Sequence, residues 1–141
     1  MISGIMKTVA EELSKQGTMK FKEGATEDQI ITFEEVHLLH LPTKYTEWLQ
    51  YSDGGEFFLP AGVQFYGVAH KPVIDIDDDS RPSDSYIVIG ALASGDPILC
   101  EKESEQISIY NQEAGRIESD ETYPDFIAFL KDLPNILGIG G

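Results

Sequence analysis

The apolar residues change their spacing at Asp53-Gly54-Gly55, and this change constrains the fold more than any other feature of the sequence. Before it, apolar residues recur at three- and four-residue intervals, which is the spacing of one helix face. After it, they form short runs separated by turn-forming residues, a pattern typical of strands. Because glycine readily takes the left-handed conformation that ends a helix, Gly54 and Gly55 mark the boundary between the two parts.

Two helices are predicted early in the first part. One has its apolar face between Ile5 and Leu13 and ends near Gly17. The other begins at Thr26, which forms a capping box with Gln29 three positions later. The apolar stripe of this second helix is predicted to contain Ile30, Phe33 and Val36.

A third helix is predicted to open at Pro42, because proline presets the backbone angle of a first helical turn. Its buried face is predicted to consist of Tyr45, Trp48 and Leu49. The short stretch Met19–Phe21 is ambiguous between helix and strand.

The apolar runs after Gly55 predict seven short strands followed by one helix. The connections are short except for the Asp- and Ser-rich segment 77–85, and short connections between consecutive strands favour an antiparallel sheet. The final helix is predicted to be capped by Thr122, with Pro124 just inside its start and Pro134 at its end. The predicted strands are Glu56–Leu59, Val63–Val68, Lys71–Ile76, Tyr86–Leu92, Pro97–Lys102, Gln106–Tyr110 and Arg116–Ser119. This order of helices, strands and helix predicts a single α+β domain over residues 1–141.

Charge limits the classes of partner. The chain of 141 residues has 10 basic and 25 acidic side chains, a net charge of −15. Binding to a phosphate backbone requires lysines and arginines, so a nucleic-acid partner is not expected, and neither is an anionic membrane surface. The longest apolar run, Ile87 to Ala93, is far shorter than the roughly 20 residues that cross a bilayer.

The same sequence predicts a cytoplasmic protein. Met1 to Ala10 contain one lysine and no continuous apolar core, so no secretory signal is expected. The single cysteine, Cys100, excludes an intramolecular disulfide and fits a reducing compartment.

The acidic cluster after Ile74 resembles a calcium loop only in part. Asp75, Asp77 and Asp79 stand at the first, third and fifth positions of such a loop. Ser80 and Tyr86 stand where the loop needs its glycine and its bidentate glutamate. A solvated acidic loop is therefore the favoured interpretation, and a calcium site is the alternative.

No motif indicates catalysis, a metal or a cofactor. His37 and His40 could share a helix face, but the sequence has no HExxH motif and no paired cysteines. Cys100 lies in an apolar run beside Glu101, where a thiol is expected to be a small buried hydrophobe. The sequence also lacks a GxSxG nucleophile elbow and a glycine-rich phosphate loop. We therefore expect a protein that is not an enzyme.

A series of landmarks resembles the signature of the SUKH superfamily, also called Smi/Knr-like. It opens with Gly24-Ala25-Thr26-Glu27-Asp28-Gln29-Ile30 and ends in the final helix. The resemblance covers about residues 24–133, so the first helix, within residues 1–17, is extra. Two features depart from the family pattern: Asp53 replaces the usual asparagine, and the stretch before Leu41 is rich in histidine. The structural signature residues are Ile30, Phe33, Glu34, Leu41, Pro42, Tyr45, Trp48, Leu49, Gly54 and Gly55.

The resemblance implies a non-enzymatic binding domain. Bacterial members of this family resemble immunity proteins that neutralise polymorphic toxins, nucleases among them, as in toxin–antitoxin pairs. Fungal members resemble scaffolds that regulate cell-wall synthesis. The signature carries no catalytic residue to transfer.

An acidic surface suits a basic protein partner such as a nuclease toxin, because opposite charges accelerate encounter. The alternative is that the acidity only keeps the protein soluble. The partner, the oligomeric state and the binding surface stay open at this point. The hypothesised partner-binding residues are Asp75, Asp77, Asp78, Asp79, Asp84, Glu101, Glu103 and Glu105.

Overall fold

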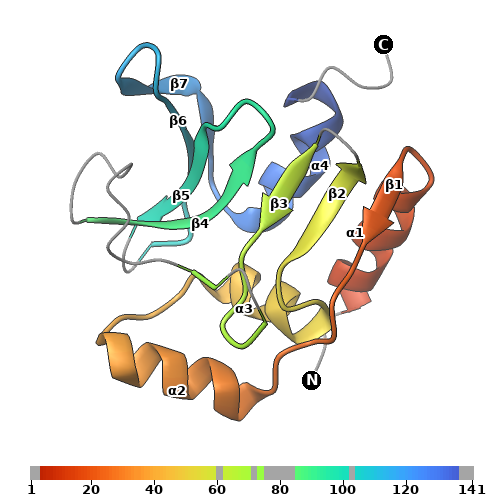
Figure 1. Ribbon diagram of the computed structural model, residues 1–141, viewed down its shortest axis with the longest axis vertical. Coiled ribbons are helices and arrows are strands. Elements are labelled where there is room, and N and C mark those ends of the chain that lie inside the picture. The colour runs from red at the N-terminus through yellow and green to blue at the C-terminus, as the bar shows by residue number, and fades with distance from the viewer. Residues whose placement is uncertain (1–3, 60–61, 71–72, 75–84, 102–103, 137–141) are drawn as a thin grey trace.

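A computed structural model describes residues 4–59, 62–70, 73–74, 85–101 and 104–136. It has four helices and seven strands within these residues (Figure 1). The helices are α1 (Gly4–Ser14), α2 (Glu27–His37), α3 (Thr43–Tyr51) and α4 (Phe126–Ile136). The strands are β1 (Thr18–Lys20), β2 (Gly55–Leu59), β3 (Val63–Phe65), β4 (Tyr86–Leu92), β5 (Pro97–Glu101), β6 (Ile107–Asn111) and β7 (Arg116–Tyr123).

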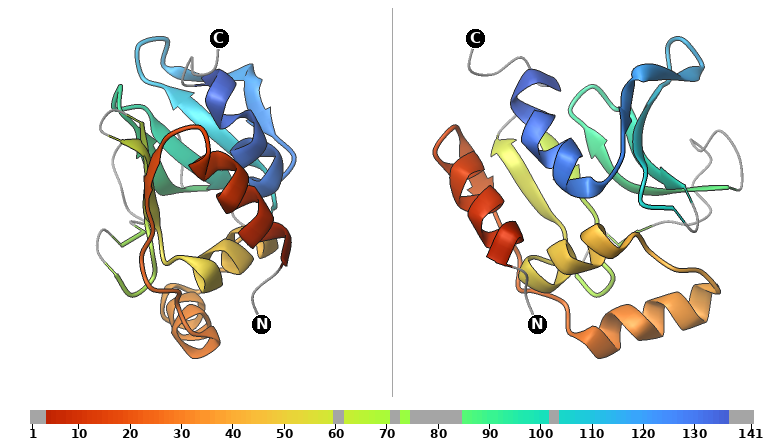
Figure 2. Two further views of the ribbon diagram at one scale, coloured as in Figure 1. Left: turned by 90° about the vertical axis from the view of Figure 1, so that its right-hand side faces the viewer. Right: turned by 180° about the vertical axis from the view of Figure 1, so that it is seen from behind.

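The strands form one antiparallel sheet in which each strand pairs with the next along the chain, in the order β1 to β7. Figure 2 shows α1, α3 and α4 packed together over one face of this sheet. In the same views α2 lies apart from the sheet, at one end of the molecule. The predicted α+β class, with helices before an antiparallel sheet and a helix after it, is confirmed.

The core beneath the helices is aromatic. Trp48 of α3 is fully buried and contacts the rings of Phe21, Phe57 and Phe126 at centroid distances of 5.9, 5.3 and 6.1 Å. Phe65 of β3 adds edge contacts to Phe57 and Phe126. Edge-to-face contacts of this kind stabilise a core beyond the area they bury. The rings therefore join α3, α4 and the first strands of the sheet.

The ends of α2 follow the predicted capping signals. The Gln29 amide donates to the Thr26 hydroxyl at 3.1 Å, and the Thr26 amide donates to the Gln29 side-chain oxygen at 2.9 Å. This reciprocal pair confirms the capping box. The helix ends at Leu38, whose φ of 55° places it in the left-handed region.

Several details of the predicted helices are wrong. Val36 is 68% exposed, because α2 packs on the body only through Ile30 and Phe33. β7 continues through Tyr123, so Thr122 is not a cap and Pro124 lies before α4 rather than inside its start. The carboxylate of Asp125 accepts the amide of Ala128 at the start of α4 instead. Pro134 lies inside α4. It is in the last turn, where one missing amide hydrogen bond is tolerated more easily than in the middle of a helix.

The predicted strands differ mainly in length. Met19–Phe21 contains most of β1, which the spacing left ambiguous because the strand has only three residues. The strand predicted over Val63–Val68 ends at Phe65, since the following residues turn toward Asp53. Of the strand predicted over Lys71–Ile76, the structure describes Val73 and Ile74, and it shows one isolated parallel bridge from Val73 to Gly67.

Candidate functional site

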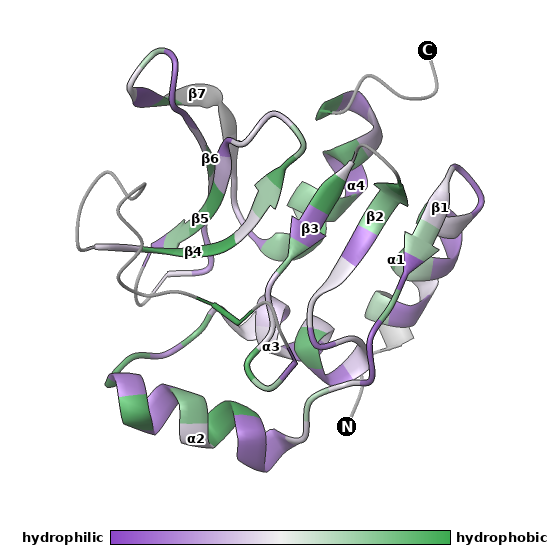
Figure 3. Ribbon diagram, in the orientation of Figure 1, coloured by the Kyte–Doolittle hydropathy of each residue, from purple (hydrophilic) through white to green (hydrophobic). Residues whose placement is uncertain are grey.

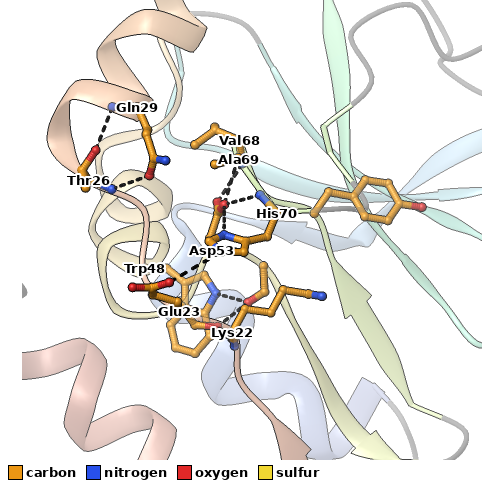
Figure 4. A network of polar contacts seen from close by, with 12 residues as sticks. Lys22, Glu23, Thr26, Gln29, Trp48, Asp53, Val68, Ala69 and His70 are labelled. Carbon is orange, nitrogen blue, oxygen red and sulfur yellow. Dashed lines mark hydrogen bonds and ion pairs between the residues drawn. The ribbon is translucent and has the colours of Figure 1, made fainter.

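The most extensive polar cluster in the described part of the chain surrounds Asp53, just after α3 (Figure 4). The Asp53 side chain is fully buried. Its carboxylate accepts the backbone amides of Val68 at 2.7 Å, Ala69 at 2.9 Å and His70 at 2.7 Å. It also lies 2.9 Å from Nδ1 of the His70 ring. Several hydrogen bonds to one carboxylate offset the cost of burying its charge.

The neighbours of Asp53 tie the same turn to other segments. The Asp53 amide donates to the carbonyl of Glu23 at 3.1 Å. The hydroxyl of Ser52 accepts the amide of Lys22 at 3.0 Å and donates to the carbonyl of Gly54 at 2.9 Å. The Trp48 indole donates to the same carbonyl at 3.0 Å. The turn that follows α3 therefore holds together the chain before α2 and the chain after β3.

The Asp53–His70 pair resembles half of a catalytic triad, but its contacts indicate a structural role. A triad needs a nucleophile at the other ring nitrogen. His70 Nε2 lies 3.9 Å from the carboxylate of Glu23, which is no hydroxyl or thiol that a histidine could deprotonate. The Asp53 oxygens are meanwhile occupied by three backbone amides. The pair fixes the turn at residues 67–70.

Sequence reasoning missed this pair. The sequence pattern gives His70 no role, and it marks Asp53 only as part of the glycine boundary and as a replacement for the family's usual asparagine. The available signal was the glycine at position 67, where an added Cβ would collide with Oδ1 of Asp53. A sequence alone does not show that two segments 17 residues apart meet.

The signature residues make the fold. Most of them are buried in the core. Two of them, Glu34 and Gly54, fix the course of the backbone. The carboxylate of Glu34 accepts the amide of Leu41 at 2.7 Å and so closes the connection between α2 and α3. Gly54, with φ of 100°, would place a Cβ 2.7 Å from the carbonyl oxygen of Phe65, so a side chain there is excluded. The buried members are Ile30, Phe33, Leu41, Pro42, Tyr45, Trp48, Leu49, Gly54 and Gly55.

The residues hypothesised to bind a partner are only partly described. Glu101 lies at the end of β5, half-buried and opposite Tyr86. Glu105 uses both carboxylate oxygens to accept the amides of Thr43 at 2.6 Å and Lys44 at 3.1 Å. It therefore caps the N-terminus of α3 from a distant part of the chain. Outside the described residues lie Asp75, Asp77, Asp78, Asp79, Asp84 and Glu103.

Removing this cap gives a first prediction. Glu105→Ala is expected to lower the free energy of unfolding by about 1 kcal/mol, because α3 loses the acceptor for two amides at its first turn. Urea unfolding measures the change. Glu113→Ala, at an exposed turn position, is the matched control and should change stability by less than half as much. Equal effects of the two substitutions would contradict the capping role.

The histidines and the cysteine have ordinary surroundings. The His37 ring packs on Phe33 at 4.4 Å between centroids, and His40 lies 3.9 Å from a Glu34 oxygen. In the described ranges no group of three or more His, Cys, Asp or Glu side chains could hold a metal ion. Cys100 is buried, and its burial, with a smaller contribution from the charge of Glu105, raises the pKa of the thiol far above its usual value. A protonated buried thiol is a poor nucleophile.

Exposed apolar side chains gather on α2. Ile31, Val36 and Leu38 are three of the four large hydrophobic residues that are exposed in the described part of the chain. Figure 3 shows α2 alternating between hydrophobic and hydrophilic residues along its length. Two hollows flank the helix, one of about 480 Å³ beside Leu38 and one of about 370 Å³ beside Val36. Hollows with apolar walls are the usual form of a binding surface.

The comparisons with known proteins identify the family. No helix among the described residues is both long and apolar enough to cross a membrane. No curated protein matches the chain significantly. The family model described as the SMI1 / KNR4 family (SUKH-1) matches residues 24–132, which include α2, α3, the Asp53 turn, strands β2 to β7 and most of α4. This chain belongs to the SMI1 / KNR4 (SUKH-1) family.

Proposed function

We propose that this protein is a non-enzymatic immunity protein that binds and neutralises a toxin domain, with a nuclease as the expected class. The observation that carries the proposal is the family match over residues 24–132, because this family comprises immunity proteins and Smi/Knr-type regulators that act through protein interactions. A net charge of −15 adds support, since nuclease domains carry basic surfaces for their own substrates.

A non-enzymatic mechanism is consistent with the chemistry of the described residues. The one Asp–His pair is engaged with the backbone, and the one thiol is buried and protonated. Neutralisation would then follow from covering the toxin's active surface. Charge complementarity accelerates such an encounter by roughly 10 to 1,000-fold.

The test begins with the genes beside the gene for this chain, and a toxin domain encoded there is purified for a binding measurement. The two purified proteins should form a stable complex, and the complex should lack the toxin's activity. Raising the salt concentration from about 50 to 500 mM should slow association about tenfold or more, since screening weakens long-range attraction. Stopped-flow fluorescence with a dye attached to the toxin domain measures the rate. An association rate that does not change with salt would remove the electrostatic part of the proposal.

The second candidate is a regulatory scaffold of the Smi/Knr type without a toxin partner, which the same family match supports. The two candidates differ in gene neighbourhood and in complex formation. A neighbouring toxin gene whose product binds this chain supports the immunity role. If no toxin gene lies beside the gene for this chain, the scaffold role is favoured. It is also favoured if a neighbouring toxin domain does not bind this protein.

A further inference from the structure

The residue that ends α2 is exposed and conformationally strained. Leu38 is 91% exposed, the largest exposed fraction among the described large hydrophobic residues. Its φ of 55° lies in the left-handed region, which a leucine enters at a cost and a glycine does not. Neither packing nor backbone conformation within this chain favours a leucine there. A contact with another molecule would favour it.

Leu38 shares one side of α2 with a second exposed apolar residue. Ile31, 41% exposed, precedes it by seven positions, which is two helical turns. Between them lies a hollow of about 480 Å³, and we call its six lining residues the α2 groove. A neighbouring hollow shares Ile31 with it and extends the depression toward Thr46 of α3. The residues of the α2 groove are Ile31, Glu34, Glu35, Leu38, Leu39 and His40.

The segment that forms the groove is acidic, and the nearest lysines in the sequence, Lys22 and Lys44, stand just outside it. Residues 23–43 contain five carboxylates and neither lysine nor arginine. Two of the five, Glu34 and Glu35, lie in the groove itself. A partner surface that complements the groove therefore combines an apolar side chain with surrounding positive charges. A second copy of this chain, which would bring the same negative face, would be repelled.

We propose that the α2 groove is the docking surface of this protein, and that its occupant is a protein surface with a protruding apolar side chain ringed by lysines and arginines. The inference rests on the proposed function, since it names the surface through which a basic toxin domain would be bound. Leu38 and Ile31 supply the apolar contact, and the carboxylates around them select the basic rim.

The first experiment tests the groove with a peptide and needs no toxin. The probe is a helical peptide of about 12 residues with leucines along one face and lysines along the other, titrated into the isotopically labelled protein. The amide signals of residues 31–40 should shift more than the rest, and high salt should reverse the shifts. A scrambled peptide of the same composition, which has no continuous leucine face, should shift them less. Shifts centred elsewhere, or equal shifts with both peptides, would overturn the proposal.

The second experiment uses a substitution that is expected to weaken binding without lowering stability. Leu38→Gly relieves the left-handed strain, so the midpoint of urea unfolding should not fall. The same change removes the exposed apolar side chain, so the affinity for the neighbouring toxin domain and for the peptide should fall at least tenfold. Val36→Ala is the matched control, because Val36 is exposed on the other side of α2 and should change affinity less than twofold.

The outcomes separate this inference from the proposed function. A toxin domain that binds Leu38→Gly as tightly as the wild-type protein overturns the groove and leaves the immunity role intact. A toxin domain that binds neither protein refutes the immunity role, and the peptide titration still decides on the groove. If sedimentation shows that the protein self-associates and that Leu38→Gly abolishes this association, the groove binds a second copy of the chain. That result would overturn the proposal of a basic partner surface.

Discussion

Asp53→Ala is expected to lower the free energy of unfolding by about 3–5 kcal/mol, the largest effect of any single polar substitution that we predict. The substitution removes a fully buried carboxylate and leaves the partly buried backbone amides of Val68, Ala69 and His70 without their acceptor. A buried donor that loses its partner costs about 1–3 kcal/mol, and because these amides are only partly buried, hydration and relaxation of the turn recover part of the sum. Urea unfolding followed by Trp48 fluorescence measures the change.

Two variants control this prediction. Asp53→Asn keeps one acceptor oxygen and the shape of the side chain, but its amide group faces the donors, so an intermediate loss of about 1–2 kcal/mol is expected. Asp96→Ala removes one hydrogen bond, to the amide of Gln112, at an exposed turn and should cost less than Asp53→Asn. If Asp53→Ala cost no more than Asp96→Ala, the Asp53 cluster would not hold the turn at residues 67–70.

Trp48→Ala is expected to cost about 3–5 kcal/mol, the range found when a buried large aromatic is truncated to alanine. The substitution removes contacts with the rings of Phe21, Phe57 and Phe126 and leaves a cavity where α3 meets α4 and the sheet. Circular dichroism during urea unfolding is the measurement, since Trp48 is the only tryptophan of the chain.

Trp48→Phe separates packing from hydrogen bonding at this position. Phenylalanine keeps an aromatic ring but loses the indole donor to the carbonyl of Gly54. That carbonyl still accepts the hydroxyl of Ser52, so the loss is expected to stay near 1–2 kcal/mol. Equal losses for Trp48→Ala and Trp48→Phe would mean that the hydrogen bond, rather than the ring packing, makes this tryptophan necessary.

The apolar signature residues face the core, whereas the apolar docking residues face outward. Trp48 and Leu49 face the core, and one carboxylate oxygen of Glu34 accepts the amide of Leu41. Ile31 and Leu38 face outward from α2. The family signature therefore reports on the scaffold that places α2. The proposed docking residues lie on the outward side of α2, and Glu34 is the one signature residue that also lines the α2 groove.

Local patterns predicted the helices before the boundary and most of the sheet. The capping box at Thr26 depends on contacts between residues close in sequence, and the helix start at Pro42 and the boundary at Gly54 follow from the backbone angles that proline and glycine favour, so local sequence predicted all three. The pattern failed at Thr122, because a strand that pairs with β6 extends through that position. Pairing with a neighbouring strand outweighed the local preference for a helix cap.

The sequence alone determined the fold class, the family and the negative charge, because these follow from composition, from short-range periodicity and from landmarks in a fixed order. Only the tertiary structure decided what the individual polar residues do. It assigned Asp53 to the turn at residues 67–70 and Glu105 to the start of α3, and it left Leu38 exposed on α2. The physical reason is that a carboxylate or a leucine takes its role from the groups that surround it in space, and those groups come from distant parts of the chain.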